Sequence, residues 1–378
     1  MSEVLLKDIT ELIVDCPHST AYDEGKGFPL VRTPNIGKGR LIYNGMHRVS
    51  EEVYNQRNAR AVPQEDDLIF AREATAGNVA LIHKGEKVCL GQRTVLIRPD
   101  KTKVDPAYLT YTLLAPKQQY NLLSTANGAT VAHVNLPTIR NLKLDIPNIE
   151  TQHRIASILS RYDSLIENYQ KQIKLLEEAA QRLYKEWFVD LRFPGHENTK
   201  IVNGVPEGWE KKKVGDIVPI KTGKKDANYG TSDGAYPFFT CSQEPIKAPS
   251  YSFDANAVIL AGNGDFNVKL YRGKFEAYQR TYVLEPNNPS MLYLLYFCIS
   301  ENMNKLASGA SGSTIKFLTK GMIDSLEMFV PIETIVARFN QYIEANQSEK
   351  ERIHSQIRLL IESRDRLLPK LMSGEIAI

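Results

Sequence analysis

The sequence repeats itself at an offset of 184 residues, and this repeat restricts the chain to a tandem architecture. "STANGATVAHVNLPTIRNLKLDIP" (residues 124–147) lies without a gap on "SGASGSTIKFLTKGMIDSLEMFVP" (residues 308–331), with seven identities that include Ile139 with Ile323. Further upstream, "QRTVLIRP" (residues 92–99) resembles "QRTYVLEP" at an offset of 187, so a small length change separates the halves there. The repeat predicts two copies of one unit, a β-rich segment of about 130 to 150 residues followed by a helix.

Each copy ends in a heptad pattern, which predicts a long helix packed along another helix. In "SLIENYQKQIKLLEEAAQRLYKEW" (residues 164–187), apolar or small residues recur at spacings of four and three, and neither Gly nor Pro interrupts residues 153–189. The offset of 184 carries this seam onto the second copy. The seam residues that we expect to pair are Tyr169, Ile173, Leu176, Leu183 and Trp187 in the first helix and Ile353, Ile357, Leu360, Leu367 and Leu371 in the second.

The second seam is more polar than the first. Its polar members are Asn346, Lys350 and Arg364, which stand where the first copy has Tyr162, Ile166 and Ala180. Polar seam positions favour one specific helix pair over a self-associating zipper. Pro369 is expected to end or kink the second helix near its last turn, because proline cannot donate the backbone hydrogen bond of a helix.

An apolar seam needs a partner that covers it, and the repeat supplies that partner within the same chain. The fold class that we expect is α+β: two pseudo-repeated α+β domains separated by two long antiparallel helices that form a coiled coil. The expected boundaries are a first domain at 1–147, a first spacer helix at 148–190, a linker at 191–210, a second domain at 211–331, a second spacer helix at 332–372 and a tail at 373–378.

Composition excludes other classes of protein. With 42% hydrophobic and 24% charged residues, no apolar run of membrane length and no signal peptide in "MSEVLLKDITELIVDC", we expect a soluble, cytoplasmic protein with no membrane partner. The net charge of +3 is too small to establish nucleic-acid binding by itself. Neither a disulfide framework nor a zinc site is predicted, because no C-x-x-C pair occurs among Cys16, Cys89, Cys241 and Cys298.

Catalytic motifs are missing as well. The glycine turns around Gly128 and Gly312 lack the G-K-[ST] ending of a nucleotide-binding loop, and we expect them to be structural turns. An adenine methyltransferase needs an Asn-Pro-Pro-aromatic stretch, whereas the single Asn-Pro of this chain is Asn288-Pro289. The sequence also has no Walker loop, no metal-ligating His cluster and no serine elbow. It therefore predicts no catalytic residue, no metal site and no cofactor.

The repeated arrangement resembles the specificity subunit of type I restriction-modification enzymes. The residues that carry the resemblance are "LDIPNIETQHRIASIL" followed by "LIENYQKQIKLLEEAAQRLYKEWF", the ending "LLPKLMSGEIAI", and the openings "FPLVRTPNIGKGRL" and "AYPFFTCS". The resemblance covers essentially the whole chain. It implies two target-recognition domains, each reading one half of a split double-stranded DNA target. It also implies helices that act as a ruler and as a platform for two methyltransferase subunits, with restriction and translocation subunits joining the complex.

On this resemblance, the chain is non-catalytic alone and directs the adenine-N6 methyltransferase and endonuclease activities of its partners. A helix from about Thr151 to Trp187 spans roughly 50 Å at about 1.5 Å per residue, which corresponds to roughly 15 base pairs. Because the two β-rich segments differ in sequence, we expect different half-sites and an asymmetric target.

Base readout requires side chains with paired donors and acceptors, chiefly Arg, Lys, Asn and Gln, presented on loops of a stable core. In the first domain the candidate DNA-binding residues are Arg32, Asn35, Lys38, Arg40 and Arg72. In the second domain they are Lys221, Lys224, Lys225, Asn228 and Tyr229 in "KTGKKDANYG", with Asn267, Lys269 and Arg272 near "NGDFNVKLYRG". Lysines beside glycines in "KTGKKDANYG" are typical of a phosphate clamp.

Two other functions remain open on the sequence. A fused two-domain enzyme with an unrecognised site predicts activity from the chain alone, and the absence of acid-base and metal constellations argues against it. A coiled-coil protein-interaction scaffold predicts a homodimer without a basic face on its β-rich domains.

Overall fold

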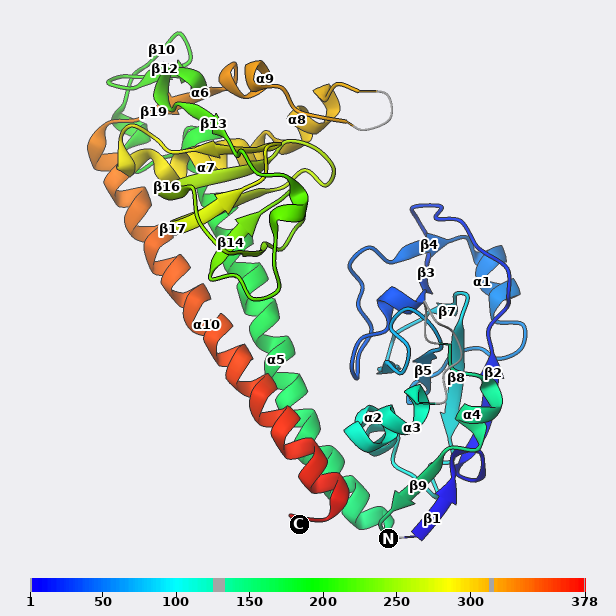
Figure 1. The fold of residues 1–378 in the computed structure, drawn as a ribbon. Helices are drawn as coiled ribbons and strands as arrows, with labels where there is room; N and C mark the ends of the chain where they lie inside the picture. The colour runs from blue at the N-terminus through cyan, green and yellow to red at the C-terminus, as the bar shows by residue number, and fades with distance from the viewer. Residues whose placement is uncertain (1, 125–132, 313–315, 377) are drawn as a thin grey trace. The chain divides into compact units, whose positions relative to one another are not determined.

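The computed structural model describes residues 2–124, 133–312, 316–376 and 378 (Figure 1). Gly128 and the neighbouring repeat residues 125–132, as well as 313–315, lie outside the described residues. The chain forms two compact units, one made of Met1–Tyr169 with Ser355–Ile378 and the other of Gln170–His354. Each unit contains one α+β domain and a part of both long helices. The expected fold class is confirmed.

The domain of the first unit contains a two-stranded sheet β1-β9, a four-stranded sheet β2-β8-β5-β6 and a three-stranded sheet β4-β3-β7. Its strands are β1 (Ser2–Leu5), β2 (Thr10–Asp15), β3 (Phe28–Val31), β4 (His47–Val49), β5 (Leu68–Ala71), β6 (Val79–Leu81), β7 (Cys89–Leu90), β8 (Thr94–Pro99) and β9 (Lys143–Ile146). Its helices are η1 (Leu6–Ile9), η2 (Thr33–Asn35), α1 (Glu51–Arg57), α2 (Pro106–Leu114), α3 (Pro116–Leu123) and α4 (Leu136–Arg140).

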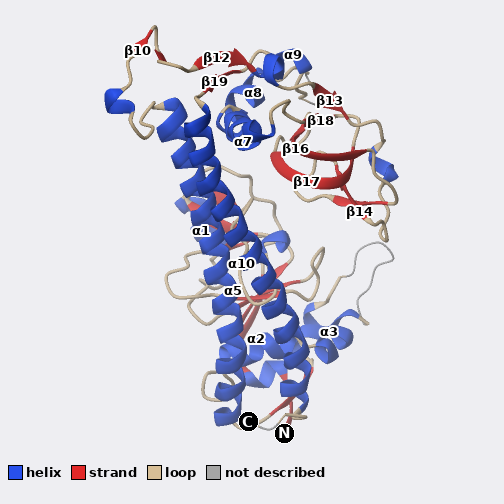
Figure 2. Cartoon of the chain, turned by 90° about the vertical axis from the view of Figure 1, so that its left-hand side faces the viewer, coloured by secondary structure: helices blue, strands red, loops and turns tan. Residues whose placement is uncertain are grey.

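The domain of the second unit contains a hairpin β10-β11, a two-stranded sheet β12-β19 and a six-stranded sheet β13-β18-β16-β17-β14-β15. Its strands are β10 (Ile201–Val202), β11 (Val205–Pro206), β12 (Glu210–Lys213), β13 (Ile220–Thr222), β14 (Tyr236–Phe239), β15 (Ile246–Ala248), β16 (Phe253–Ala261), β17 (Val268–Ala277), β18 (Thr281–Leu284) and β19 (Glu327–Val330). Its helices are η4 (His196–Asn198), α6 (Val214–Ile217), η5 (Ala227–Tyr229), η6 (Pro289–Met291), α7 (Leu292–Glu301), α8 (Met303–Gly309) and α9 (Lys320–Asp324). Helix α7 packs on β16 and β17 (Figure 2).

The two domains share their strand pairing. Leu68 of β5 lies opposite Ile97 of β8, and Val258 of β16 lies opposite Leu284 of β18. Leu284 lies 187 residues after Ile97, and this is the offset at which "QRTVLIRP" matches "QRTYVLEP". The order β13-β18-β16-β17 in the second domain therefore repeats the order β2-β8-β5-β6 in the first. A parallel pairing is repeated as well: β3 pairs with β7 in the first domain, and β14 pairs with β17 in the second.

The long helices begin at equivalent positions of the repeat. Helix α5 (Ile149–Tyr184) continues as a π-helical turn, η3 (Lys185–Val189), and α10 (Glu333–Ser373) begins 184 residues after α5. The Oδ1 atom of Asn148 accepts a hydrogen bond from the Thr151 N–H at 2.9 Å and so caps α5. Pro369 lies inside α10, and the helix continues to Ser373, so the proline does not end the helix where it stands.

Within each unit, parts of α5 and α10 lie side by side and run antiparallel (Figure 1). Among the predicted seam residues Trp187, Ile353 and Leu371 are buried. The other seam residues are half-buried: Tyr169, Ile173, Leu176, Leu183, Ile357, Leu360 and Leu367. Leu371 belongs to the core of the first unit, and Trp187 belongs to the core of the second.

Candidate DNA-recognition surfaces

In the first unit, a network of polar side chains holds the domain against the helix pair. Asp163 of α5 accepts a hydrogen bond from the Tyr111 hydroxyl at 2.5 Å and forms an ion pair with Arg364 of α10 at 2.6 Å. Burial, and then the charge of Asp163, raises the pKa of Tyr111 above its ordinary value. Arg40, a predicted DNA-binding residue, forms an ion pair with Glu167 of α5. Its contact therefore positions the 36–41 loop on the helix.

In the second unit, aromatic side chains join the helices to each other and to the domain, where Phe297 of α7 stacks on Tyr184 with ring centroids 5.8 Å apart. Phe339 of α10 is fully buried and packs against Tyr184, Trp187 and Phe188 with ring centroids 6.3, 6.0 and 4.9 Å away. Two polar contacts join the helices beyond this cluster. Asn346 donates to the Leu176 carbonyl at 3.0 Å, and Lys350 pairs with Glu177 at 2.7 Å.

Two predicted DNA-binding residues of the first domain make internal contacts. Asn35 is 2% exposed, and its side chain accepts from the Arg32 N–H and donates to the Ile42 carbonyl. Arg72 is 8% exposed and donates to both carboxylate oxygens of Asp15, at 2.9 and 2.8 Å. Its Nε donates to the Val134 carbonyl at 3.0 Å. These side chains brace the loops on which they stand.

Lys38 and Arg32 are more accessible to solvent than Asn35 and Arg72. Lys38 is exposed beside the Tyr111–Asp163 contact. Arg32 is half-buried and donates from Nη2 to the Gly45 carbonyl at 3.1 Å. Of the first-domain candidates, Lys38 presents its amine to solvent, and Arg32 lines a pocket.

In the second domain, the "KTGKKDANYG" segment presents several side chains to solvent. Lys221, Lys224 and Asn228 are exposed, and Lys221 also lies 3.7 Å from Glu285. The Lys225 ammonium stands 4.3 Å from the ring centroid of Tyr229, whose hydroxyl lies 2.8 Å from Ser250 Oγ. The cation–π contact orders this turn, which includes η5, and leaves a cluster of positive charge at the surface.

The other second-domain candidates are held by neighbouring groups. Asn267 donates to the Cys241 carbonyl at 3.1 Å and to the Asp265 carbonyl at 2.6 Å, and it accepts from Lys269. Burial lowers the pKa of Lys269. Arg272 stacks on Tyr293 and lies 3.7 Å from Glu344 of α10, so it ties β17 to the helix within the second unit.

Sequence reasoning missed Arg57, which lies at the end of α1 and is 5% exposed. It lines a pocket with Arg32, Gln92 and Arg93. Arg32, Arg57 and the Gln92-Arg93 pair are far apart in the sequence, and no spacing pattern links them. The repeated dipeptide at Gln92-Arg93 and Gln279-Arg280 was the one available signal that this strand end matters.

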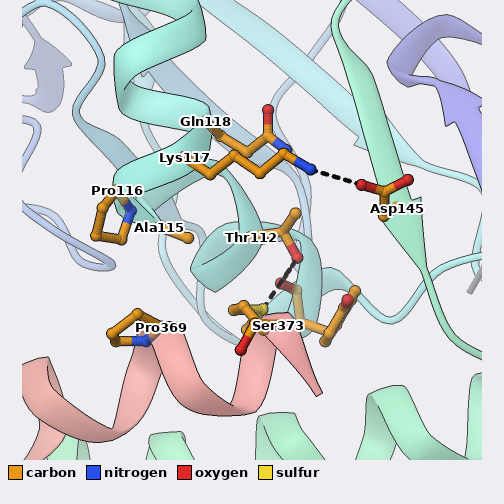
Figure 3. Close-up of a pocket in the computed structure, with 10 residues that line it drawn as sticks. Thr112, Ala115, Pro116, Lys117, Gln118, Asp145, Pro369 and Ser373 are labelled. Carbon is orange, nitrogen blue, oxygen red and sulfur yellow. Dashed lines mark hydrogen bonds and ion pairs between the residues drawn. The ribbon is translucent and has the colours of Figure 1, made fainter. Parts of the chain in front are cut away.

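A second cavity, of about 260 Å³, lies in the first unit where α2 and α3 meet the last turns of α10. Figure 3 shows Pro369 and Ser373 of α10 on one side and Pro116 and Thr112 on the other. The Lys117 ammonium at its edge pairs with Asp145 at 2.7 Å. Its lining is mostly apolar, and it brings no set of reactive groups together.

Over the described ranges, no three His, Cys, Asp or Glu side chains are grouped so that they could hold a metal ion. Over the same ranges, no helix combines the length and the apolar character that crossing a membrane requires.

Comparison with known proteins identifies relatives of the whole chain. The family described as the type I restriction modification DNA specificity domain matches twice, at residues 2–178 and 206–359. The EcoDI specificity subunit of Escherichia coli is 37% identical over 176 residues, which cover 46% of this chain and 39% of that subunit. The MjaIX specificity subunit of Methanocaldococcus jannaschii is 25% identical over 407 residues, which cover 99% of this chain and 93% of that protein.

A solved structure shares the fold. The crystal structure of the type I restriction-modification S subunit from M. genitalium superimposes with a TM-score of 0.55 at 15% sequence identity. The match covers 98% of this chain and 95% of that one. At this identity the likeness concerns the fold alone.

Proposed function

Because the chain belongs to the family of type I restriction-modification specificity subunits, with two copies of the DNA specificity domain, we propose that it recognises a split, asymmetric DNA target with one half-site per domain. The observation that carries this proposal is the repeated strand pairing combined with different loops. Both domains keep the register of their central strands, whereas the residues at the strand ends differ. A constant scaffold with variable loops suits two recognition modules that read different bases.

We assign the recognition domains to residues 1–147 and 211–331, with spacer helices at 148–190 and 332–372. The side chains available for DNA are those that the structure leaves at the surface. In the second domain these are Lys221, Lys224, Lys225, Asn228 and Tyr229, and in the first domain Lys38 is the exposed member. Lysines of this kind bind phosphates and position the duplex, while Asn and Tyr side chains contact base edges.

The helices offer a repeated surface for two methyltransferase subunits. Leu175 of α5 is 63% exposed, and Leu359 of α10, at the equivalent position of the repeat, is 57% exposed. Because both helices present the same residue at equivalent positions of the repeat, two copies of one partner would meet the same side chain on each helix. In this proposal the chain has no chemistry of its own, acts in the cytoplasm, and directs adenine methylation by these subunits and cleavage by restriction subunits that join them.

The test is sequencing of adenine methylation in a host that carries this chain with its companion methyltransferase, compared with a host that lacks the chain. We expect a methylated motif with two different half-sites and an unread spacer, which disappears with the chain. A motif that persists without the chain would show that another protein selects the target. A homodimer of the chain that binds no duplex in a gel-shift assay would instead favour the scaffold function.

A further inference from the structure

A pocket of about 220 Å³ in the first domain is formed by the ends of two parallel strands. Because β3 and β7 run in parallel, the residues that follow them, Arg32-Thr33 and Gly91-Gln92-Arg93, leave the sheet side by side. The Gly91 N–H donates to the Val31 carbonyl at 2.8 Å, and a Cβ at Gly91 would lie 2.6 Å from that oxygen. The two segments therefore approach each other closely at Gly91, which lines the pocket.

Arg57 lies in this pocket without a carboxylate partner. Its Nε donates to the Leu90 carbonyl at 2.8 Å, and Nη1 donates to the backbone carbonyl and the hydroxyl of Ser19 at 2.7 and 3.0 Å. Nη2 is buried and has no acceptor among the residues that the structure describes. Burial lowers the pKa of Arg57, as expected for a desolvated cation.

Arg32, which also lines the pocket, repeats this pattern. Its Nε is buried and has no acceptor within the described part of the chain, while Nη2 donates to the Gly45 carbonyl. The third arginine, Arg93, pairs with Glu73, which also contacts His133. The described residues that line the pocket include three arginines and no Asp or Glu.

A buried cation without a counter-charge is unfavourable, and buried polar groups are normally satisfied. Two of the arginines that line this pocket each keep a buried guanidinium nitrogen without an acceptor among the described residues, which indicates a missing oxyanion. Guanidinium groups match phosphate oxygens in charge and in geometry. The pocket adjoins exposed residues 22–27 and 42–45, so a ligand that inserts one phosphate has room to continue outside it.

We propose that this pocket binds one backbone phosphate of the DNA half-site that the first domain reads. The inference rests on the proposed function and adds a residue-level contact to it. The phosphate oxygens accept hydrogen bonds from Arg57 and Arg32, with Gln92 and Arg93 at the rim. Among the described residues of the second domain this site is not repeated at the equivalent strand end, where Thr240 stands in place of Arg32, by the parallel pairing of Leu30 with Cys89 and of Phe238 with Glu276.

The decisive test changes the DNA and the protein together. The target duplex, once defined by methylation sequencing, is synthesised with an uncharged methylphosphonate at each successive position of the first half-site. Binding by the complex of the full chain with its methyltransferase is then measured. We expect one position at which the substitution weakens wild-type binding about tenfold or more. For the Arg32→Gln variant, the methylphosphonate at that position has no further effect on binding, because the contact to this phosphate is already lost.

Matched variants separate this contact from general electrostatics. Arg48→Gln is the control, because Arg48 is an exposed arginine of the neighbouring strand β4 that likewise donates to one carbonyl, that of Gly27. Arg32→Gln should lower the slope of log affinity against log salt by about 1, and Arg48→Gln should not lower it. Arg57→Lys, which keeps the charge but loses the fork of donors, should weaken binding to the same phosphate.

The outcomes separate the two hypotheses. A complex that prefers the target duplex but has no phosphonate-sensitive position that depends on Arg32 overturns the pocket and leaves the proposed function intact. A wild-type complex that prefers no duplex overturns the proposed function. The melting temperature of the full chain is also measured with and without inorganic phosphate at constant ionic strength. A rise with phosphate shows that the chain binds a small anion. Stabilisation that Arg32→Gln abolishes, without any effect of methylphosphonates, would show that the pocket holds a free anion instead.

Discussion

The two units differ in the side chains that join the domain to the helices. In the first unit Asp163 and Arg364 form a buried ion pair that Tyr111 completes. The equivalent positions in the second unit hold Gln347 and Ala180, by the offset of 184, so this ion pair has no counterpart there. Instead, aromatic rings pack around Phe339, whose equivalent in the first unit is Ile155. The repeat thus conserves the path of the backbone while the side chains at the junction diverge.

The loops differ in the same way. In the first domain, Arg72 follows β5 and is anchored by Asp15 at the end of β2. In the second, the residue that follows β16 is Gly262, and β13 ends at Thr222, so neither partner of that contact exists. A recognition surface built on strand ends can therefore change entirely while the strand register stays constant.

The largest test of this comparison makes the two domains identical. Replacing residues 210–330 by residues 2–146 joins strands that already start and end the domains in the same way, β1-β9 for β12-β19. We expect the methylated motif to become symmetric, with the first half-site on both sides of the spacer. The reciprocal replacement should give a symmetric motif of the second half-site. An unchanged asymmetric motif from a folded hybrid would contradict the assignment of one half-site to each domain.

The next test removes the aromatic contact of the second unit. Phe339→Ala leaves a cavity among Tyr184, Trp187 and Phe188, and it should lower the free energy of unfolding by about 3 to 5 kcal/mol. Both tryptophans, Trp187 and Trp209, lie in this core, so urea unfolding followed by tryptophan fluorescence reports on it.

The control for this variant lies at the equivalent position of the first unit. Ile155→Ala removes a core residue that is buried there, and it should leave the midpoint of the fluorescence transition nearly unchanged, because neither tryptophan lies in that core. Equal shifts of the fluorescence midpoint for both variants would show that the two units unfold as one.

A smaller effect is expected for the polar junction. Tyr111→Phe removes the hydrogen bond to the Asp163 carboxylate and should cost about 2 kcal/mol of stability near pH 7. Because burial raises the pKa of folded Tyr111, the wild type gains this stability below about pH 10, where the unfolded tyrosine is protonated, and loses it as the pH rises further. The difference between the two proteins should shrink above pH 10 in urea titrations. Tyr120→Phe, at an exposed site, is the control.

The smallest effect concerns the helix seam. Lys350→Ile installs in the second unit the residue type that the first has at Ile166 and removes the ion pair with Glu177. Because replacing a partly buried ion pair by an apolar group is often neutral or favourable, we expect a change between zero and about 1 kcal/mol toward greater stability. Glu177→Gln should cost less than about 1 kcal/mol in the same fluorescence assay. A loss of several kcal/mol for Lys350→Ile would show that the pair is needed for the helix contact.

The fold followed from the sequence where the signal was repetitive. The offset of 184 predicted equivalent helix starts, and the structure places them at Ile149 and Glu333. Pro369 was a weaker guide to the end of the second helix, because α10 extends past it to Ser373. A local residue preference is weaker evidence than a pattern that recurs along the chain.

The candidate site was harder to predict, because solvent exposure depends on contacts between distant residues. Asn35 and Arg72 have the donors that base readout needs, but Ile42 and Asp15 engage those donors. The pocket around Arg57 depends on β3 and β7 lying in parallel, and a single sequence does not show such a pairing.

The strand pairs that close the domains bear on how such a gene changes. Ser2 lies opposite Ile146, and Glu210 lies opposite Val330, so the chain enters and leaves each domain at neighbouring points. Segments whose ends are adjacent are exchanged with little disturbance to the rest of a protein. A recombination event within the codons of one domain leaves the helices and the other domain unaltered. Such an event would replace all the loops of one domain in a single step, while the strands that enter and leave it keep their pairing.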